Sequence, residues 1–186
     1  GPPAGGGPGM IMRADIVLPI IKKMRLNGDK RPLIVPAARG IKYDQKITKE
    51  LVKKDGLIFL CGRFEGIDQR IIELSGALEL SIGDYILSNG DIAAINIIDS
   101  CVRLLDGVLS TKTSVESESF EGGLLEYPQY TLPRDYDGSK IPDVLLSGDH
   151  GAINKWRDSQ SSLTTEKNRP DLYEKFQKKI KDSDSS

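Results

Sequence analysis

The chain has 186 residues, of which 38% are hydrophobic and 28% are charged, and its net charge is −1. These proportions are typical of a globular protein, and no apolar run approaches the ~20 residues that a membrane-spanning helix needs. Cys61 and Cys101 are too few for a disulfide framework, and a single histidine argues against a metal site. We therefore expect a cytoplasmic protein with reduced thiols, no metal and no membrane association.

Charge is unevenly distributed along the chain. Residues 21–54 carry eleven Lys and Arg against three acidic residues, whereas residues 65–121 carry eleven Asp and Glu against three basic ones. The basic block suits phosphate contacts. A solvated helix face that carries lysines for solubility explains the same block, so charge alone leaves both interpretations open.

Helical and strand-like patterns alternate through the first hundred residues. Glycine and proline exclude regular structure over 1–9, and apolar spacing then predicts a helix over 14–26, bent or restarted at Pro19. The following elements, in chain order, are a strand over 33–35, a loop over 36–40, an amphipathic helix over 43–54, a strand over 57–60, a loop over 62–66, a short helix over 67–74 and a strand over 77–82.

Asp91 is predicted to cap a helix that runs through Leu105. The apolar residues of this helix form one stripe, namely Ile92, Ile95, Ile98, Val102 and Leu105. Strand–helix alternation predicts an α/β protein with a mostly parallel sheet.

The chain changes character after this helix. Residues 109–121 are polar without apolar periodicity, which predicts a linker. Two helices are predicted beyond it, one over about 152–163 and one from Pro170 to Lys181, before a frayed end. The predicted organisation is a cofactor-binding α/β domain over 1–109, a flexible linker over 110–123 and a small C-terminal helical domain over 124–186.

Two glycine-punctuated loops each follow a short apolar strand. They read CGRFEGID over 61–68 and SIGDYILSNGD over 81–91. Glycine permits positive φ or close backbone approach, and the Asp, Ser and Asn residues between the glycines form turns and caps. Loops of this kind at the carboxyl edge of a parallel sheet predict a ligand crevice.

In this order and spacing, CGRFEGIDQR, SIGDYILSNGD and IIDSCVRLLDGVL resemble the bacterial tRNA (guanine-N1)-methyltransferase family, part of the SPOUT superfamily of knotted methyltransferases. Stretches over 5–10, 118–131 and 142–157 fit the same family. The resemblance implies a deep trefoil knot in the sheet, where pattern alone predicts an open doubly wound sheet. In the family a strand and a helix precede the first of these stretches, so we expect the sequence to be truncated or to begin after a part that was not included.

The resemblance also implies a binding site for S-adenosyl-L-methionine. Adenine needs an apolar slot and main-chain groups that read its edge, and these loops can offer both. Tight turns of an α/β core would explain the same glycines. Asn89 and Asp91 stand where the family often has glycine and glutamate, and residues 37–40 depart from its Ser-Pro loop. The implied cofactor-binding residues are Pro36, Gly62, Glu65, Ile82, Gly83, Asp84, Tyr85, Ile86, Leu87 and Gly90.

Methylation of guanine N1 requires a base for the N1 proton and a donor for the charge that develops on O6. By resemblance, the base is Glu118, with Glu116 as the nearby alternative, and the donor is Arg103. A solvated linker carboxylate and an ion pair between Arg103 and Asp99 are the structural alternatives.

His150 and Trp156 match the family in the C-terminal part. We interpret His150 as a helix-capping residue and Trp156 as a core residue.

The family implies that the substrate is tRNA, modified at the guanosine 3′ of the anticodon, and that the protein is a homodimer whose active site lies between subunits. The alternatives are a knotted methyltransferase acting on ribose 2′-hydroxyls and a non-catalytic RNA-binding module. A dinucleotide-dependent oxidoreductase is disfavoured, because no GxGxxG follows the first strand.

Overall fold

The computed structural model describes residues 1–108, 119–120 and 122–184. The chain divides into two compact units, Gly1–Ser110 and Thr111–Ser186.

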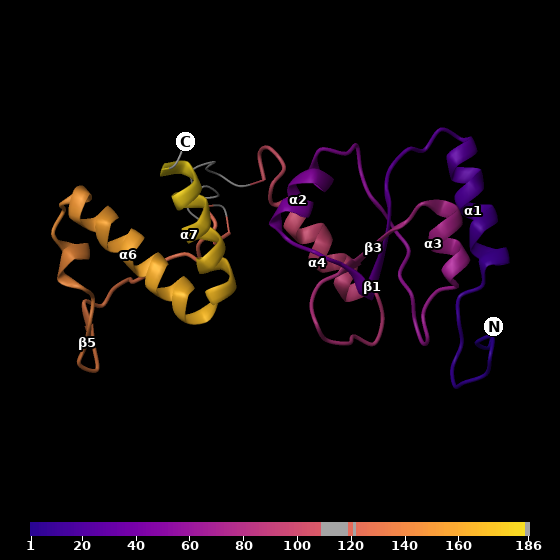
Figure 1. Cartoon of the computed structure of the whole chain (residues 1–186), viewed down its shortest axis with the longest axis horizontal. Coiled ribbons are helices and arrows are strands. Elements are labelled where there is room, and N and C mark those ends of the chain that lie inside the picture. The colour runs from indigo at the N-terminus through magenta and orange to yellow at the C-terminus, as the bar shows by residue number, and fades with distance from the viewer. Residues whose placement is uncertain (109–118, 121, 185–186) are drawn as a thin grey trace. The chain divides into compact units, whose positions relative to one another are not determined.

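The N-terminal unit is built on a parallel sheet with helices on both faces. Among the described residues the strand order is β2 (Ile58–Phe59), β1 (Leu33–Lys42) and β3 (Leu78–Ser81), and both pairings are parallel. Figure 1 shows α1 (Ala14–Leu26) and α3 (Gln69–Ser75) on one side of this sheet, and α2 (Gln45–Val52) and α4 (Asp91–Val102) on the other. The predicted α/β class with a parallel sheet is therefore confirmed.

The core of this unit forms where the central strands meet α2 and α4. Ile34 of β1, Leu80 of β3 and Ile97 of α4 are fully buried, and Leu51 and Cys101 complete the cluster. The strand positions are apolar on both sides because helices cover both faces of the sheet.

Strand β1 is longer than predicted. Residues 36–40 were expected to form a loop, but β1 continues through them to Lys42, with a register irregularity between Pro36 and Ile41. Gly40 makes this possible, because a Cβ there would lie 2.6 Å from the main-chain carbon of Glu79. The strand pattern ended at Pro36 in the sequence because proline cannot donate to a strand ladder.

The face of α4 that is buried differs from the apolar stripe in the sequence. Ala93, Ala94, Ile97 and Cys101 face the core, whereas the predicted stripe is exposed, with Ile92 60% and Ile95 59% accessible. The helix is thus apolar on both faces, and sequence periodicity could not tell which one packs inward. Its N-cap is Gly90 rather than Asp91, and it ends at Val102 rather than Leu105.

A buried polar cluster joins α2 to the last turn of α4. The Tyr43 hydroxyl lies 2.6 Å from Ser100 Oγ and accepts a hydrogen bond from Thr48 Oγ1 at 2.8 Å. Burial raises the pKa of Tyr43, so the hydroxyl stays neutral in this cluster. The cluster fixes the C-terminal end of α4, and Arg103 is the next residue after this helix.

The C-terminal unit packs two helices together. They are α6 (His150–Asn168) and α7 (Pro170–Asp184), preceded by a hairpin of β4 (Asp135–Tyr136) and β5 (Ser139–Lys140) and by the 3-10 helix η1 (Asp143–Leu146). Both helices are longer than predicted, and α7 includes residues that were expected to fray. Asp149 caps α6 by accepting from the main-chain N–H of Gly151 and Ala152 at 2.9 and 3.0 Å, so His150 is not the cap.

The segment before the hairpin is anchored on α6. The Leu125 N–H donates to Oγ1 of the fully buried Thr165 at 2.8 Å. Ser119 and Phe120, which fall in the predicted linker, are hydrogen-bonded to Glu126 and Leu124.

Within the described residues, none of the helices is both long enough and apolar enough to span a membrane.

Candidate active site

The carboxyl ends of the three parallel strands open into one cavity of about 400 Å³. Its wall comes from three stretches of the N-terminal unit, with Ala93 of α4. The stretches are residues 35–39 of β1, residues 62–67 after β2, and residues 79–83 and 85–90 of β3 and the loop that follows it. The crevice predicted at this edge of the sheet is present, because parallel strands bring their following loops together there.

Main-chain contacts join the two glycine-marked loops. The Gly90 N–H donates to the Gly62 carbonyl at 3.0 Å, and Arg63 and Asn89 form an isolated antiparallel bridge. A Cβ at Gly90 would lie 3.2 Å from Cys61 Cα and 3.3 Å from the Gly62 nitrogen. This close approach explains why glycine is needed at position 90.

The loop after β3 turns back on itself at Gly83. Ser81 Oγ donates to the Gly83 carbonyl at 3.1 Å, and Ser81 is itself buried. A Cβ at Gly83 would collide with the ring of Tyr85. The turn therefore places the apolar run Tyr85–Leu87 along the cavity, where its main-chain groups are available to a ligand.

A second turn presents Glu65 beside the N-terminal segment. The Glu65 N–H donates to the Met10 carbonyl at 3.1 Å, and a Cβ at Gly9 would come within 2.5 Å of Glu65 Cγ. Asp68 caps α3 just after this loop, and its hydrogen bond to Arg70 lowers the pKa of Asp68 to about 2. The cap therefore remains ionised at neutral pH.

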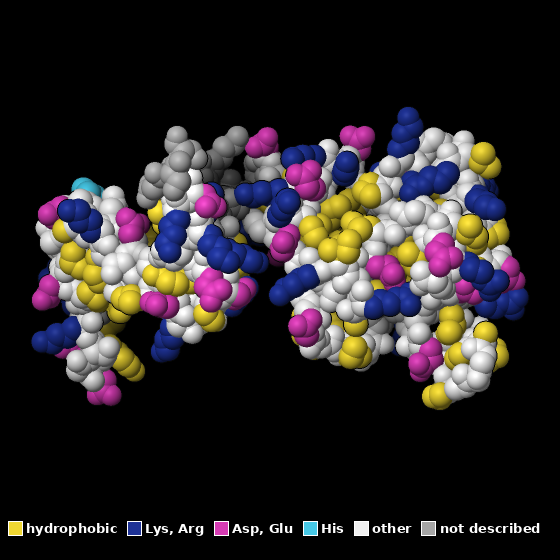
Figure 2. Space-filling model, in the orientation of Figure 1, with side chains coloured by type: hydrophobic (Ala, Val, Ile, Leu, Met, Phe, Trp, Pro, Cys, Tyr) yellow, Lys and Arg dark blue, Asp and Glu magenta, His cyan; other side chains and the backbone are white. Residues whose placement is uncertain are grey.

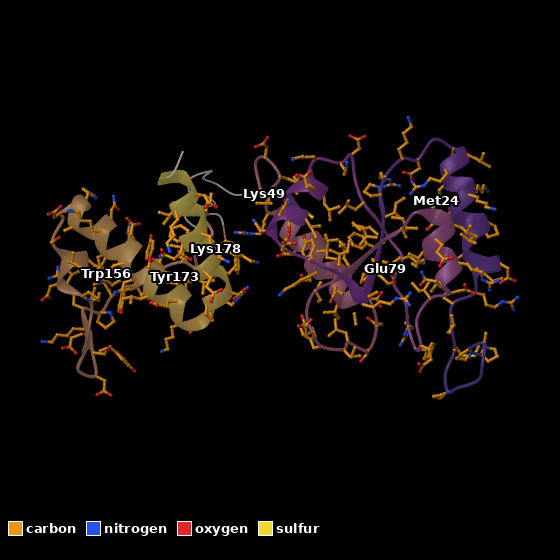
Figure 3. All side chains as sticks on the ribbon, viewed as in Figure 1. Met24, Lys49, Glu79, Trp156, Tyr173 and Lys178 are labelled. Atoms are coloured by element: carbon orange, nitrogen blue, oxygen red, sulfur yellow. The ribbon has the colours of Figure 1, made fainter. Side chains whose placement is uncertain are left out.

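An ion pair joins β1 to β3 in the cavity wall. Arg39 Nε donates to Glu79 Oε1 at 3.0 Å, and Arg39 Nη2 donates to Gln69 Oε1 at 2.7 Å. Figure 3 labels Glu79 in the N-terminal unit. The exposed Arg39 side chain is thereby held across β1, β3 and α3.

The structure gathers nearly all of the predicted cofactor-binding residues around this cavity. Asp84 is the exception, since it does not line the wall. Arg103 follows the C-terminal end of α4 and does not line the cavity either; its N–H donates to the Asp99 carbonyl at 3.1 Å. Glu118 and Glu116 lie outside the described residues. The nine that line the cavity are Pro36, Gly62, Glu65, Ile82, Gly83, Tyr85, Ile86, Leu87 and Gly90.

Several cavity residues were not predicted. Arg39, Arg63 and Phe64 line the wall, and the Arg63 guanidinium lies 5.7 Å from the centre of the Phe64 ring. Phe64 adopts a positive φ of 55°, which is uncommon for a bulky residue and marks a tight turn. The position of Arg63 and Phe64 between Gly62 and Gly66 was the available signal for these two residues.

The cavity fits S-adenosyl-L-methionine in size and in chemistry. Its volume of about 400 Å³ is in the range of small-molecule sites. Ile82, Ile86 and Leu87 supply an apolar slot, and Glu65 contributes a carboxylate to the wall, whereas the Glu79 carboxylate is paired with Arg39. The group that would be held carries a positive sulfur, which an acidic neighbour such as Glu65 favours. Among the described residues no cluster of side chains could hold a metal ion.

Gly90→Val is expected to weaken S-adenosyl-L-methionine binding by roughly 5- to 150-fold. The added side chain must push apart two loops whose main chains are already in contact, and overpacking of this kind costs about 1–3 kcal/mol. Isothermal titration calorimetry measures the change.

Gly76→Ala is the matched control for this test. Gly76 ends α3 at a φ of 65° and has open space around its Cα, so the variant should lose stability without losing affinity. Equal affinities for the Gly90→Val and unaltered chains would show that the junction of the two loops does not shape the site.

Comparison with known proteins gives one consistent result. The family model described as tRNA (Guanine-1)-methyltransferase TrmD matches residues 2–175. Proteins named tRNA (guanine-N(1)-)-methyltransferase are similar over most of the chain. The one from Rhizobium etli is 47% identical over 94% of this chain and 75% of its own length. Those from Rhodopseudomonas palustris strain TIE-1 and Agrobacterium fabrum are 51% and 49% identical, over 92% and 96% of this chain and 68% and 77% of their own lengths.

Proposed function

Because the chain belongs to the tRNA (guanine-1)-methyltransferase family, we propose that it methylates N1 of the guanosine 3′ of the anticodon in tRNA, with S-adenosyl-L-methionine as methyl donor. The family match over residues 2–175 carries this proposal. The cavity at the strand ends supports it, because the residues that match the family's donor-binding positions line this one cavity.

The roles of the donor-site residues follow from their chemistry. Bound S-adenosyl-L-methionine supplies an activated methyl group on a positively charged sulfur. The apolar side chains of Ile82, Ile86 and Leu87 suit the adenine ring, and the main chain of Gly83 and Tyr85 offers groups that read its edge. Gly62 and Gly90 let the backbone approach the rest of the ligand.

Proton and charge transfer are assigned to two residues. As the N1–methyl bond forms and the sulfur–methyl bond breaks, the N1 proton passes to the carboxylate of Glu118. The Arg103 guanidinium donates to O6, where negative charge develops as the proton leaves N1. Holding the methyl carbon in line between sulfur and N1 is a matter of positioning, which a preformed cavity provides.

The finer features of the family belong to the same proposal. We propose that the chain around residues 81–91 is threaded as a deep trefoil knot, that the helical part over 124–186 binds tRNA, and that the protein acts in the cytoplasm.

A methyl-transfer assay tests the function directly. Unmodified tRNA and labelled S-adenosyl-L-methionine should yield N1-methylguanosine, identified by mass spectrometry of the nucleosides after digestion. A transcript with adenosine in place of the target guanosine should accept no label. Label in a ribose 2′-O-methyl group would contradict the proposal and favour the other knotted methyltransferases.

The exposed apolar stripe of α4 supports a homodimer. Its members are 41–60% accessible, although α4 already buries its other face in the core. Figure 2 shows hydrophobic side chains gathered on the N-terminal unit in the region of α2 and α4. An apolar surface of this kind marks an interaction site, and a second copy of this chain is the occupant we propose.

Ile95→Asp is expected to convert the dimer into monomers, because a carboxylate would be buried without a partner in the interface. Sedimentation velocity measures the change. Ile20→Asp on α1 is the matched control, since Ile20 and Ile95 are both 59% accessible. Full activity from an unaltered chain that sediments as a monomer would overturn the dimer.

A further inference from the structure

Arg157 of α6 has a guanidinium without a polar partner. Its Nε atom is buried and makes no hydrogen bond. Among the described residues, none of the side-chain hydrogen bonds or ion pairs involves the Arg157 guanidinium. A buried donor without a partner costs free energy, so its presence in the C-terminal unit calls for an explanation.

An aromatic ring holds this guanidinium in place. The guanidinium carbon lies 4.9 Å from the centre of the Tyr127 ring. Stacking on an aromatic face orients a guanidinium while leaving its edge donors unused. With Nε enclosed, the edge formed by the two terminal nitrogens is the part that remains open to a ligand.

The neighbouring residues leave the positive charge uncompensated. Positions three and four residues away on α6 are Ile153, Asn154, Gln160 and Ser161, none of which is acidic. Glu126, which precedes Tyr127, instead accepts from Gln129 Nε2 at 2.6 Å. An anion from another molecule is therefore the ligand that this guanidinium suits.

A second aromatic contact lies next to the first. Tyr130 meets Trp156 edge to face, with ring centres 6.2 Å apart, and Tyr130 is 47% accessible. Figure 3 labels Trp156 on α6. The segment Tyr127–Tyr130 thus lays two rings along α6, and such rings beside an open guanidinium are features that proteins use on single-stranded RNA.

We propose that Arg157, oriented by Tyr127, binds a backbone phosphate of the RNA substrate. This inference rests on the proposed tRNA substrate. The fork of terminal guanidinium nitrogens matches two phosphate oxygens, and most contacts between proteins and nucleic acids go to phosphate and sugar. The contact positions the RNA on the C-terminal unit and carries no base preference.

The dependence of tRNA affinity on salt tests the proposal. Arg157→Gln should weaken tRNA binding about tenfold at low salt and reduce the slope of log K against log salt concentration by about 0.7–0.9, the contribution of one phosphate contact. Arg157→Lys should keep the slope and recover part of the affinity, because lysine retains the charge but lacks the fork. Fluorescence anisotropy with labelled tRNA gives both quantities.

Arg169→Gln is the matched control. It removes the same charge from the same helical unit, but Arg169 is already paired with Asp171 at 2.7 and 2.8 Å. Its salt slope should equal that of the unaltered chain. Affinity for S-adenosyl-L-methionine should be unchanged in all three variants, since the cavity lies in the other unit.

Each outcome bears on the proposal. An unchanged slope and affinity in Arg157→Gln would overturn it, as would a loss of affinity that leaves the slope intact and is not recovered by lysine. The second result would indicate that Arg157 only stabilises the fold. Normal methylation together with an unchanged slope would leave the proposed function standing. A changed slope in a chain that methylates no tRNA would support the phosphate contact and contradict the proposed function.

Discussion

Glu118→Gln is expected to lower the rate of methyl transfer by about 10²–10⁴-fold, the range that a positioned general base contributes. Glutamine has nearly the same size and can still hydrogen-bond, but it cannot accept the N1 proton. Single-turnover kinetics with saturating tRNA and donor measure the chemical step without the contribution of product release.

The control for this variant lies two residues away. Glu116→Gln makes the same chemical change in the same segment, and we expect it to keep near-normal turnover. The opposite pattern would assign the base to Glu116. Near-normal turnover in both variants would remove the carboxylate from the mechanism.

Arg103→Ala is expected to slow methyl transfer by about 10²–10³-fold while affinity for S-adenosyl-L-methionine stays the same. The expected loss is that of one donor to a developing oxyanion. Arg103 is placed at the C-terminal end of α4 and outside the cavity wall, which is why donor binding should not depend on it. Calorimetry and single-turnover kinetics separate the two effects.

Asp99→Asn separates catalysis from structure at this position. If Arg103 serves only as an ion-pair partner of Asp99, the two variants should share a modest fall in melting temperature and neither should lose turnover. If Arg103 acts on O6, turnover falls in Arg103→Ala alone. Partial activity in Arg103→Lys would further support an electrostatic role.

Local signals in the sequence predicted the elements whose formation depends on interactions between residues close together in the chain. The bounds of α1 were predicted without error. The hairpin was missed although Asp137-Gly138 is a strong turn signal, and both residues have positive φ. Its two-residue strands are too short for alternation to show.

Features that depend on tertiary contacts were beyond the sequence pattern. The path of β1 past Pro36 depends on how closely Gly40 approaches β3, and the buried face of α4 depends on which of two apolar faces meets the sheet. The glycine-marked loops predicted a crevice, but the roles of Glu118 and Arg103 came from resemblance alone. A carboxylate in a polar segment and an arginine after a helix have no local signature of catalysis.

All residues that line the cavity belong to the N-terminal unit, whereas Arg157, Tyr127 and the aromatic pair belong to the other. Under the proposed phosphate contact, substitutions in the C-terminal unit can therefore change how tightly RNA is bound while the cavity in the N-terminal unit stays intact. An inhibitor that fills this cavity would contact the two glycine-marked loops, and the close main-chain approach at Gly90 leaves few substitutions there that would not also disturb the site.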